Sequence, residues 1–296
     1  MTSATTWREV WDTLVGIPLS TPHTESVVLA VAAYYIINLA VCFSLYKLSD
    51  LILPSILRML ALDFFQTMIY VTYPIGHGFL RKHHGHVGYF LFVVPLNTLT
   101  VFTFTKGNES IIGTIVKFSK GRLSMVRFLS HGAVQILAAF AARQLGIVIL
   151  ELGFHSGFNT HLEAFTPVCH SDLHLTLVMG FLLEFVGTAW DAWVFQQQFF
   201  KFQPLDVAFK FCNTALLVSL GCPLTGMYMN PAMASAFTLG CEDTPLPHHF
   251  LVYWVAPILG TFLSLWISQH YSLLKFGQDK GSGKKEESTS KKRKQA

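Results

Sequence analysis

Charged side chains are scarce in this sequence. They make up 13% of its 296 residues, about half of the roughly 25% that soluble globular domains carry. Apolar residues account for 52%, and they stand in blocks close to the roughly 18–20 residues that cross a bilayer as one helix. This composition excludes an ordinary soluble domain and predicts an all-α membrane protein.

Motifs of several other protein classes are also missing. The five cysteines form no CxxC pair or zinc-type spacing, and the apolar blocks hold no HExxH, GxSxG or paired catalytic aspartates. Much of the net charge of +4 lies in the C-terminal tail, so the body of the chain is close to neutral. We therefore expect no enzyme, no metal, no cofactor and no nucleic-acid partner, and membrane lipid as the surroundings.

The apolar blocks predict seven membrane-spanning helices. The first block begins after residue 25 and is long, so we expect a helix that stays in the membrane rather than a cleaved signal. Two stretches, 111–118 and 231–239, are too short to cross and predict re-entrant half-helices, which need a protein-enclosed cavity. The predicted spans are 27–46, 57–75, 87–104, 128–150, 173–195, 207–220 and 251–271.

Basic residues predict the orientation of these spans, because lysine and arginine are enriched in cytoplasmic loops. With the tail 277–296 in the cytoplasm, seven spans place residues 1–26 on the other side, which carries only Arg8, Arg81 and Lys82. The tail is charged and contains glycine and serine, so we expect it to be disordered. The cytoplasmic loops and helix ends would carry Lys47, Arg58, Lys106, Lys117, Lys120, Arg122, Arg127, Lys201 and Lys210.

The two halves of the chain share a pattern. An acid, then Phe, then Thr four residues after the acid, occurs as Asp63–Thr67 (DFFQT) and again as Glu184–Thr188 (EFVGT). A carboxylate inside a membrane helix is costly and needs a partner. Asn108 follows the first acid by 45 residues, and Asn230 follows the second by 46. An odd number of spans in each half makes the repeats inverted, which predicts a permeation path at their interface.

An asparagine at the start of each half-helix has a chemical consequence. Two half-helices that meet end to end point their partly positive N-termini at the bilayer centre, where they repel cations and protons. An asparagine N-cap accepts a hydrogen bond from its own helix and turns its amide hydrogens toward the lumen. We predict this role for Asn108 and Asn230. Each asparagine opens a three-residue motif, called a box below. The first box is Asn108, Glu109 and Ser110, and the second is Asn230, Pro231 and Ala232.

Over residues 57–271, three features of the sequence resemble the aquaporins. They are the motif Thr225-Gly226-x-x-x-Asn230-Pro231-Ala232, the two helices with the repeated acid, and the segment Trp254–Gly260. Cys241, nine residues after Ala232, and the altered first box are similar to the divergent superaquaporin (aquaporin eleven/twelve-like) branch. The resemblance implies an inverted repeat (57–150 and 171–271) of six transmembrane helices and two half-helices, one extra helix at 27–46, and a homotetramer.

The predicted constriction differs from that of water-selective aquaporins. Those proteins carry arginine three residues after the second-box asparagine, where this sequence has Met233. Val218 takes the place of their histidine, Met227 lies three residues before the asparagine, and Tyr89 or Phe90 would supply the aromatic side chain. A less polar opening without a fixed cation predicts weaker selectivity for water and passage of larger neutral solutes.

The two repeated acids and Cys241, the cysteine that resembles the superaquaporin branch, each allow more than one role. Asp63 and Glu184 either brace loop backbone by hydrogen bonds or carry protons. Cys241 either packs, bonds to Cys169 or Cys222, or acts as a redox gate.

The first box also has rivals. Asn97 is a second candidate for it, and Asn108-Glu109-Ser110 fits a glycosylation sequon. Glu109 would weaken cation rejection if it faced the pore, and would not if it faced aside. The histidine tracts 83–86 and 248–249 are interpreted as solvated loops rather than metal ligands.

We predict a passive channel for water and small neutral solutes such as glycerol and hydrogen peroxide. The alternative is a non-conducting structural membrane protein that keeps the aquaporin fold. Lys292 and Lys294 resemble a dilysine retrieval signal, which predicts the endoplasmic reticulum and a cytoplasmic C-terminus. The competing interpretation is a basic tail near anionic lipid, with the plasma membrane as the location.

Overall fold

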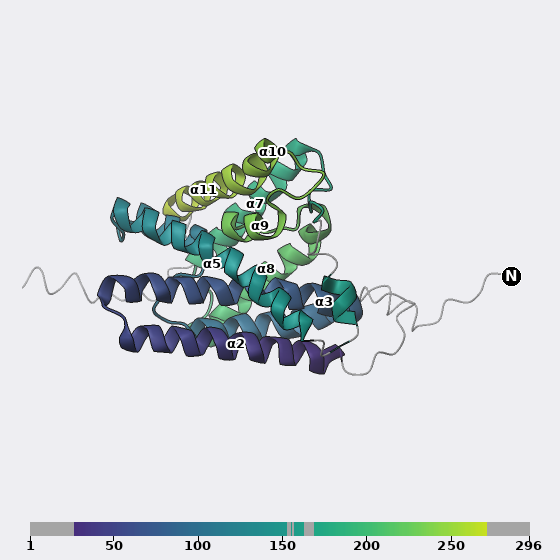
Figure 1. Ribbon diagram of the computed structural model, residues 1–296. Helices are drawn as coiled ribbons and strands as arrows, with labels where there is room; N and C mark the ends of the chain where they lie inside the picture. The colour runs from purple at the N-terminus through teal and green to yellow at the C-terminus, as the bar shows by residue number, and fades with distance from the viewer. Residues whose placement is uncertain (1–26, 153–154, 156, 163–168, 271–296) are drawn as a thin grey trace, which may run out of the picture.

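The computed structural model describes residues 27–152, 155, 157–162 and 169–270, and most of these are helical. The predictions for 1–26 and for the tail, with Lys292 and Lys294, lie outside the described residues. Figure 1 shows the arrangement of the elements. In chain order they are α2 (Val27–Ile52), α3 (Ser55–Thr103), α4 (Ile111–Ser119), α5 (Met125–Glu151), α6 (Gly157–Leu162), α7 (Leu177–Gln196), α8 (Gln203–Thr225), α9 (Pro231–Thr238), α10 (Leu246–Phe250), the π-helical turn η1 (Leu251–Val255) and α11 (Ala256–His270).

Helix α3 folds back on itself. A straight helix of 49 residues would be about 74 Å long, more than twice the roughly 30 Å of a bilayer core. At Gly85 the backbone leaves the helical region with φ 61° and ψ −160°. Tyr73 Oη then lies 2.7 Å from Thr100 Oγ1, and the rings of His77 and Tyr89 are 5.6 Å apart. The arms 55–84 and 86–103 are therefore antiparallel neighbours.

The first arm of α3 is longer than the sequence predicts. The expected span ended at residue 75, and residues 83–86 were expected in a solvated loop. The helix instead continues to the turn at Gly85, because Phe79 and Leu80 are buried. A Cβ at Gly76 would lie only 2.8 Å from the Tyr35 ring of α2, so glycine permits this close packing. The loop interpretation of the first histidine tract is wrong.

The outer surface of the bundle is apolar and its interior contains polar groups, as expected for a protein surrounded by lipid. Large apolar side chains are exposed on the outer helix faces, as at Leu51 and Val126, which are 81% and 78% exposed. Polar groups lie inside, including Asn38, Gln135 and Glu184, each at 0%. Among the described residues, six helices are long and apolar enough to cross a membrane, and the double passage of α3 makes seven crossings there. The chain is a multi-pass membrane protein.

The two halves of the bundle interlock through their short helices. Helix α9 packs against α5 of the first half, and α4 packs against α11 of the second half. Both short helices, of nine and eight residues, are too short to cross a bilayer. The predicted fold of six transmembrane helices, two half-helices and one extra N-terminal helix is confirmed.

The extra helix α2 lies beside α3 (Figure 1). Tyr34 Oη donates a hydrogen bond of 2.9 Å to the carbonyl of Thr72. Tyr35 Oη lies 2.5 Å from His77 Nδ1. Because these tyrosines are buried at 0% and 4%, α2 is bound to the first repeat along one well-packed face.

Candidate pore and its loops

The second loop ends in the half-helix α9. Asn230 caps this helix, and its side-chain oxygen accepts a hydrogen bond of 3.1 Å from the Ala232 N–H. Pro231 is the first helical residue, where a missing N–H costs nothing. Ahead of the cap, Met227 and Met229 have φ of 47° and 48°. This left-handed conformation costs a non-glycine residue about 1 kcal/mol, so the loop needs stabilising contacts.

Glu184 supplies those contacts. Its Oε2 accepts 2.9 Å from the Met229 N–H, and its Oε1 accepts 3.1 Å from the Tyr228 N–H. The Thr225 hydroxyl donates to the same Oε1 at 2.8 Å. The carboxylate is fully buried, at 0%, and it holds the backbone of the strained segment from beneath.

The segment Val252–Pro257 fixes the same loop from the other side. Tyr253 Oη donates 2.8 Å to the Thr225 carbonyl, and Trp254 Nε1 donates 2.9 Å to the Ser235 hydroxyl on α9. Both residues lie in the π-helical turn η1, an element frequent at functional sites. The sequence marked this segment only by resemblance, and the structure gives it a bracing role.

The first loop has a matching brace. Asp63 Oδ1 accepts 2.9 Å from the Asn108 N–H, across 45 residues, the same separation that joins Glu184 to Met229. The Thr67 hydroxyl donates 3.1 Å to the Asn108 carbonyl. Each acid of the repeat thus accepts hydrogen bonds from loop backbone, the contact that the predicted bracing role requires.

The cap of α4 differs from the prediction. Ser110 is the N-cap, and its Oγ accepts 3.2 Å from the Gly113 N–H. Asn108 instead donates from Nδ2 to both oxygens of Asp63, at 3.1 and 2.9 Å, while the Lys117 ammonium binds its Oδ1. No proline follows Asn108 to start the helix there, and the carboxylate lies within its reach. The prediction that Asn108 caps the half-helix is wrong.

The surroundings of Asn108 bear on its glycosylation and on the identity of the first box. The residue is 7% exposed, which counts against its glycosylation. Asn97 donates 2.8 Å to the Val93 carbonyl inside α3 and caps no helix, so the rival first box is wrong. Glu109 is exposed and is not a lining residue of the cavity described next.

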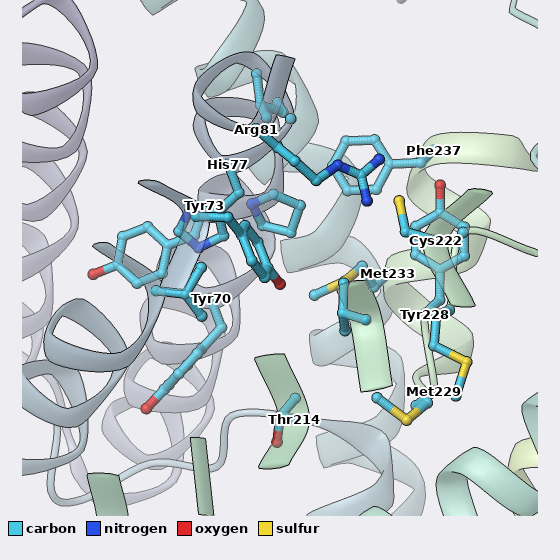
Figure 2. Close-up of a pocket in the computed structure, with 18 of the residues that line it drawn as sticks. Tyr70, Tyr73, His77, Arg81, Thr214, Cys222, Tyr228, Met229, Met233 and Phe237 are labelled. Carbon is cyan, nitrogen blue, oxygen red and sulfur yellow. The ribbon is translucent and has the colours of Figure 1, made fainter. Parts of the chain in front are cut away.

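A cavity of about 380 Å³ lies between the two repeats (Figure 2). Both arms of α3 form one wall, and α8, the second loop and α9 form the other. Four of the predicted constriction residues line it, namely Tyr89, Val218, Met227 and Met233. Phe90 is not a lining residue and packs edge-on against Tyr89 at 6.0 Å. The cavity stops short of both Asn108 and Asn230.

The cavity also has polar lining that the sequence did not single out. His77 and Asp172 face it, as does Arg81. Asn97, which the sequence offered only as a rival first box, also lines it. Arg81 served only as a topological marker in the sequence, which does not show the direction of a helical side chain. In the part of the chain that is described, no group of three or more His, Cys, Asp or Glu side chains could hold a metal ion.

This architecture has relatives. A model of the major intrinsic protein family matches residues 54–268. The chain belongs to that family. It is therefore a membrane channel protein for water or small solutes, and members of the family are channels rather than enzymes.

Individual relatives of this major intrinsic protein are distant. Aquaporin-11 of Milnesium tardigradum is 22% identical over 193 residues, 65% of this chain and 68% of the relative. Aquaporin-11 of Homo sapiens is 26% identical over 190 residues, 62% of this chain and 68% of the relative. The aquaglyceroporin of Plasmodium falciparum has a similar structure, with a TM-score of 0.55 and 15% identity over 72% of this chain and 96% of that one. The chain is a divergent, superaquaporin-like aquaporin.

A disulfide joins two loops of this aquaporin. Cys241 is bonded to Cys169, and the Glu242 N–H donates 3.0 Å to the Cys169 carbonyl beside it. Tyr228 of the second loop donates to Asp172. The segment 169–172 is thereby fixed over the second loop, with Asp172 lining the cavity. Of the roles expected for Cys241, the structure has the bond to Cys169, and Cys222 is a free thiol.

Proposed function

We propose that this chain is a passive channel for water and small neutral solutes, including glycerol and hydrogen peroxide. The observation that carries the proposal is the 380 Å³ cavity at the repeat interface, next to a half-helix capped by Asn230. Inverted repeats of membrane transport proteins place their substrate path at such an interface. A passive channel needs no catalytic residue, metal or cofactor.

The polar groups at the half-helix starts support a modified filter. Asn230 uses its side-chain oxygen as the cap, which leaves its amide hydrogens for a passing oxygen. On the opposite half-helix, Ser110 accepts from Gly113, and no acceptor among the described residues takes its hydroxyl hydrogen. We infer that one amide and one hydroxyl replace the pair of amides that the sequence predicts.

The constriction supports passage of solutes larger than water. Met227, Met229 and Met233 all line the cavity, together with Val218. Methionine side chains are flexible and polarizable, so they adapt to the shape of a passing molecule. Exchange of Met233 for arginine adds a large, charged group to this wall and narrows it, and we expect the change to reduce glycerol flux while water flux continues.

The experiment is stopped-flow permeability of proteoliposomes for water, glycerol and hydrogen peroxide. The wild-type protein is compared with Met233→Arg and with Asn230→Asp, which puts a negative charge at the start of α9. We expect flux above that of bare lipid for the wild type and a lower glycerol-to-water ratio for Met233→Arg. Wild-type flux equal to that of bare lipid for all three solutes would refute the proposal.

A non-conducting scaffold is the second candidate. The observation that favours it is the engagement of Asn108 by Asp63, which removes a donor from the pore centre. The same experiment decides between the two, because a scaffold gives bare-lipid permeability while the protein remains folded.

Location and assembly follow from the same proposal. We infer an endoplasmic reticulum membrane with a cytoplasmic C-terminus, and a homotetramer. The bond between Cys169 and Cys241 supports a lumenal position for these loops, because disulfides persist in oxidising compartments. Replacement of Lys292 and Lys294 by serine should move a tagged protein to the cell surface, and cross-linking in membranes should give a four-subunit band. Unchanged location, or a monomer only, would refute the respective inference.

A further inference from the structure

We propose that Arg81 is a specificity-determining residue of this pore, a fixed cation that excludes cations from the cavity and donates hydrogen bonds to neutral solutes. The inference rests on the proposed channel function. It assigns to the first repeat a charge that the second repeat lacks, because the second-loop helix has Met233 where a filter cation was expected.

The position of Arg81 is the first step. The residue lies near the end of the first arm of α3, four residues before the turn at Gly85, and it is half-buried. Figure 2 shows its guanidinium extending from α3 across the cavity toward Cys222 and Phe237, at the level above Met233. Cys222 lines the same cavity on the facing helix α8. A side chain that crosses the opening meets every molecule that enters from this side.

The charge of Arg81 is the second step. An arginine guanidinium stays protonated in proteins. No carboxylate of the described residues lies within salt-bridge distance of it, since the ion pairs there involve Lys106, His131, His170 and Lys210. Asp172 lines the same cavity and accepts from the Tyr228 hydroxyl, so its carboxylate shares this space with the guanidinium without a direct ion pair.

A charge without a direct ion pair is costly inside a membrane protein, and such charges mark ion and substrate paths. Arg81 lines the cavity, so the field of its guanidinium acts on whatever shares that space. A second cation within about 8 Å is repelled strongly enough to lower its occupancy about tenfold or more. Neutral solutes are not repelled, and the guanidinium offers them five N–H donors in a fixed plane.

The test is potassium flux and water flux in the same proteoliposomes. The proteins are wild type, Arg81→Met, Arg81→Lys and the matched control Lys82→Met, which removes a neighbouring cation that is exposed and does not line the cavity. We expect Arg81→Met to raise potassium permeability about tenfold, equal to about 1.4 kcal/mol, with water flux retained. Arg81→Lys and Lys82→Met should both stay close to wild type.

A rescue variant separates charge from general damage. Arg81→Met combined with Met233→Arg returns a cation to the opposite wall of the same cavity, and we expect potassium permeability to fall again. If Arg81→Met does not fold, Arg81→Gln provides the same comparison with a polar side chain. Water flux with unchanged potassium permeability in the uncharged variant overturns the role of Arg81 alone. A rise of equal size in Lys82→Met does the same, whereas absence of any wild-type flux overturns the proposed function as well.

Discussion

Glu184 holds the strained segment of the second pore loop, and Glu184→Gln tests how much the pore depends on it. The glutamine keeps one oxygen for the Thr225 hydroxyl and the Tyr228 N–H. Its amide nitrogen replaces Oε2, which accepts 2.9 Å from the Met229 N–H in the native protein. Two donors then face each other in a buried space, beside a residue with φ of 48°.

The magnitude follows from these contacts. A buried donor left without an acceptor costs about 1–3 kcal/mol. The two hydrogen bonds that remain go to a neutral oxygen rather than to a carboxylate, and each loses about half of its strength. We expect a total loss of about 3 kcal/mol in the free energy of unfolding. The loop should lose its left-handed conformation before the helices separate, so the water permeability per folded molecule should fall as well.

Asp206→Asn is the matched control. Asp206 is also a buried carboxylate that accepts from loop backbone, 2.6 Å from the Phe199 N–H and 3.0 Å from the Phe200 N–H. None of these three residues lines the cavity. Thermal unfolding in detergent and stopped-flow water permeability are measured for both variants. The reasoning is refuted if Glu184→Gln keeps wild-type permeability and stability, or if Asp206→Asn reduces the permeability equally.

Three further predictions concern other contacts. Cys169→Ser removes the disulfide over the pore mouth and should cost about 2–4 kcal/mol, seen as a lower unfolding temperature and altered non-reducing gel mobility, while Cys212→Ser, an exposed free thiol, should change neither. Tyr35→Phe removes the 2.5 Å contact to His77 and should lower stability by about 1 kcal/mol, measured by thermal unfolding. Ser110→Ala removes a helix cap worth about 1 kcal/mol and the hydroxyl that we propose to face the pore, so water flux in proteoliposomes should fall.

The spans and half-helices were predictable because apolar length fixes them. The half-helix predicted at 111–118 is α4 at Ile111–Ser119, and the one predicted at 231–239 is α9 at Pro231–Thr238. The longer first arm of α3 escaped prediction for a clear reason. Pro74 and Gly76 indicate a helix end locally, but packing against the tyrosines of α2 overrides that local signal.

The site was less predictable because its decisive contacts join distant segments. Asparagine and serine are both good N-caps, so the sequence does not show whether Asn108 or Ser110 begins α4. The choice depends on where Asp63 lies, 45 residues away. The direction of Arg81 into the cavity depends on the rotation of α3, and the cysteine pair spans 72 residues. None of these distances can be obtained from spacing alone.

The different hydrogen bonds of the two pore loops explain why the pore is asymmetric. Both repeats use their acid to hold loop backbone, so that role is structural and common to both halves. In the first repeat the carboxylate of Asp63 is also bonded to His131 and to the amide of Asn108, so this asparagine is part of the brace. Of the two box asparagines, Asn230 alone is then left to offer its amide hydrogens to a solute. With one of the two box amides engaged, the channel depends more on charge elsewhere to exclude cations, and the guanidinium of Arg81 in the cavity is placed to provide it.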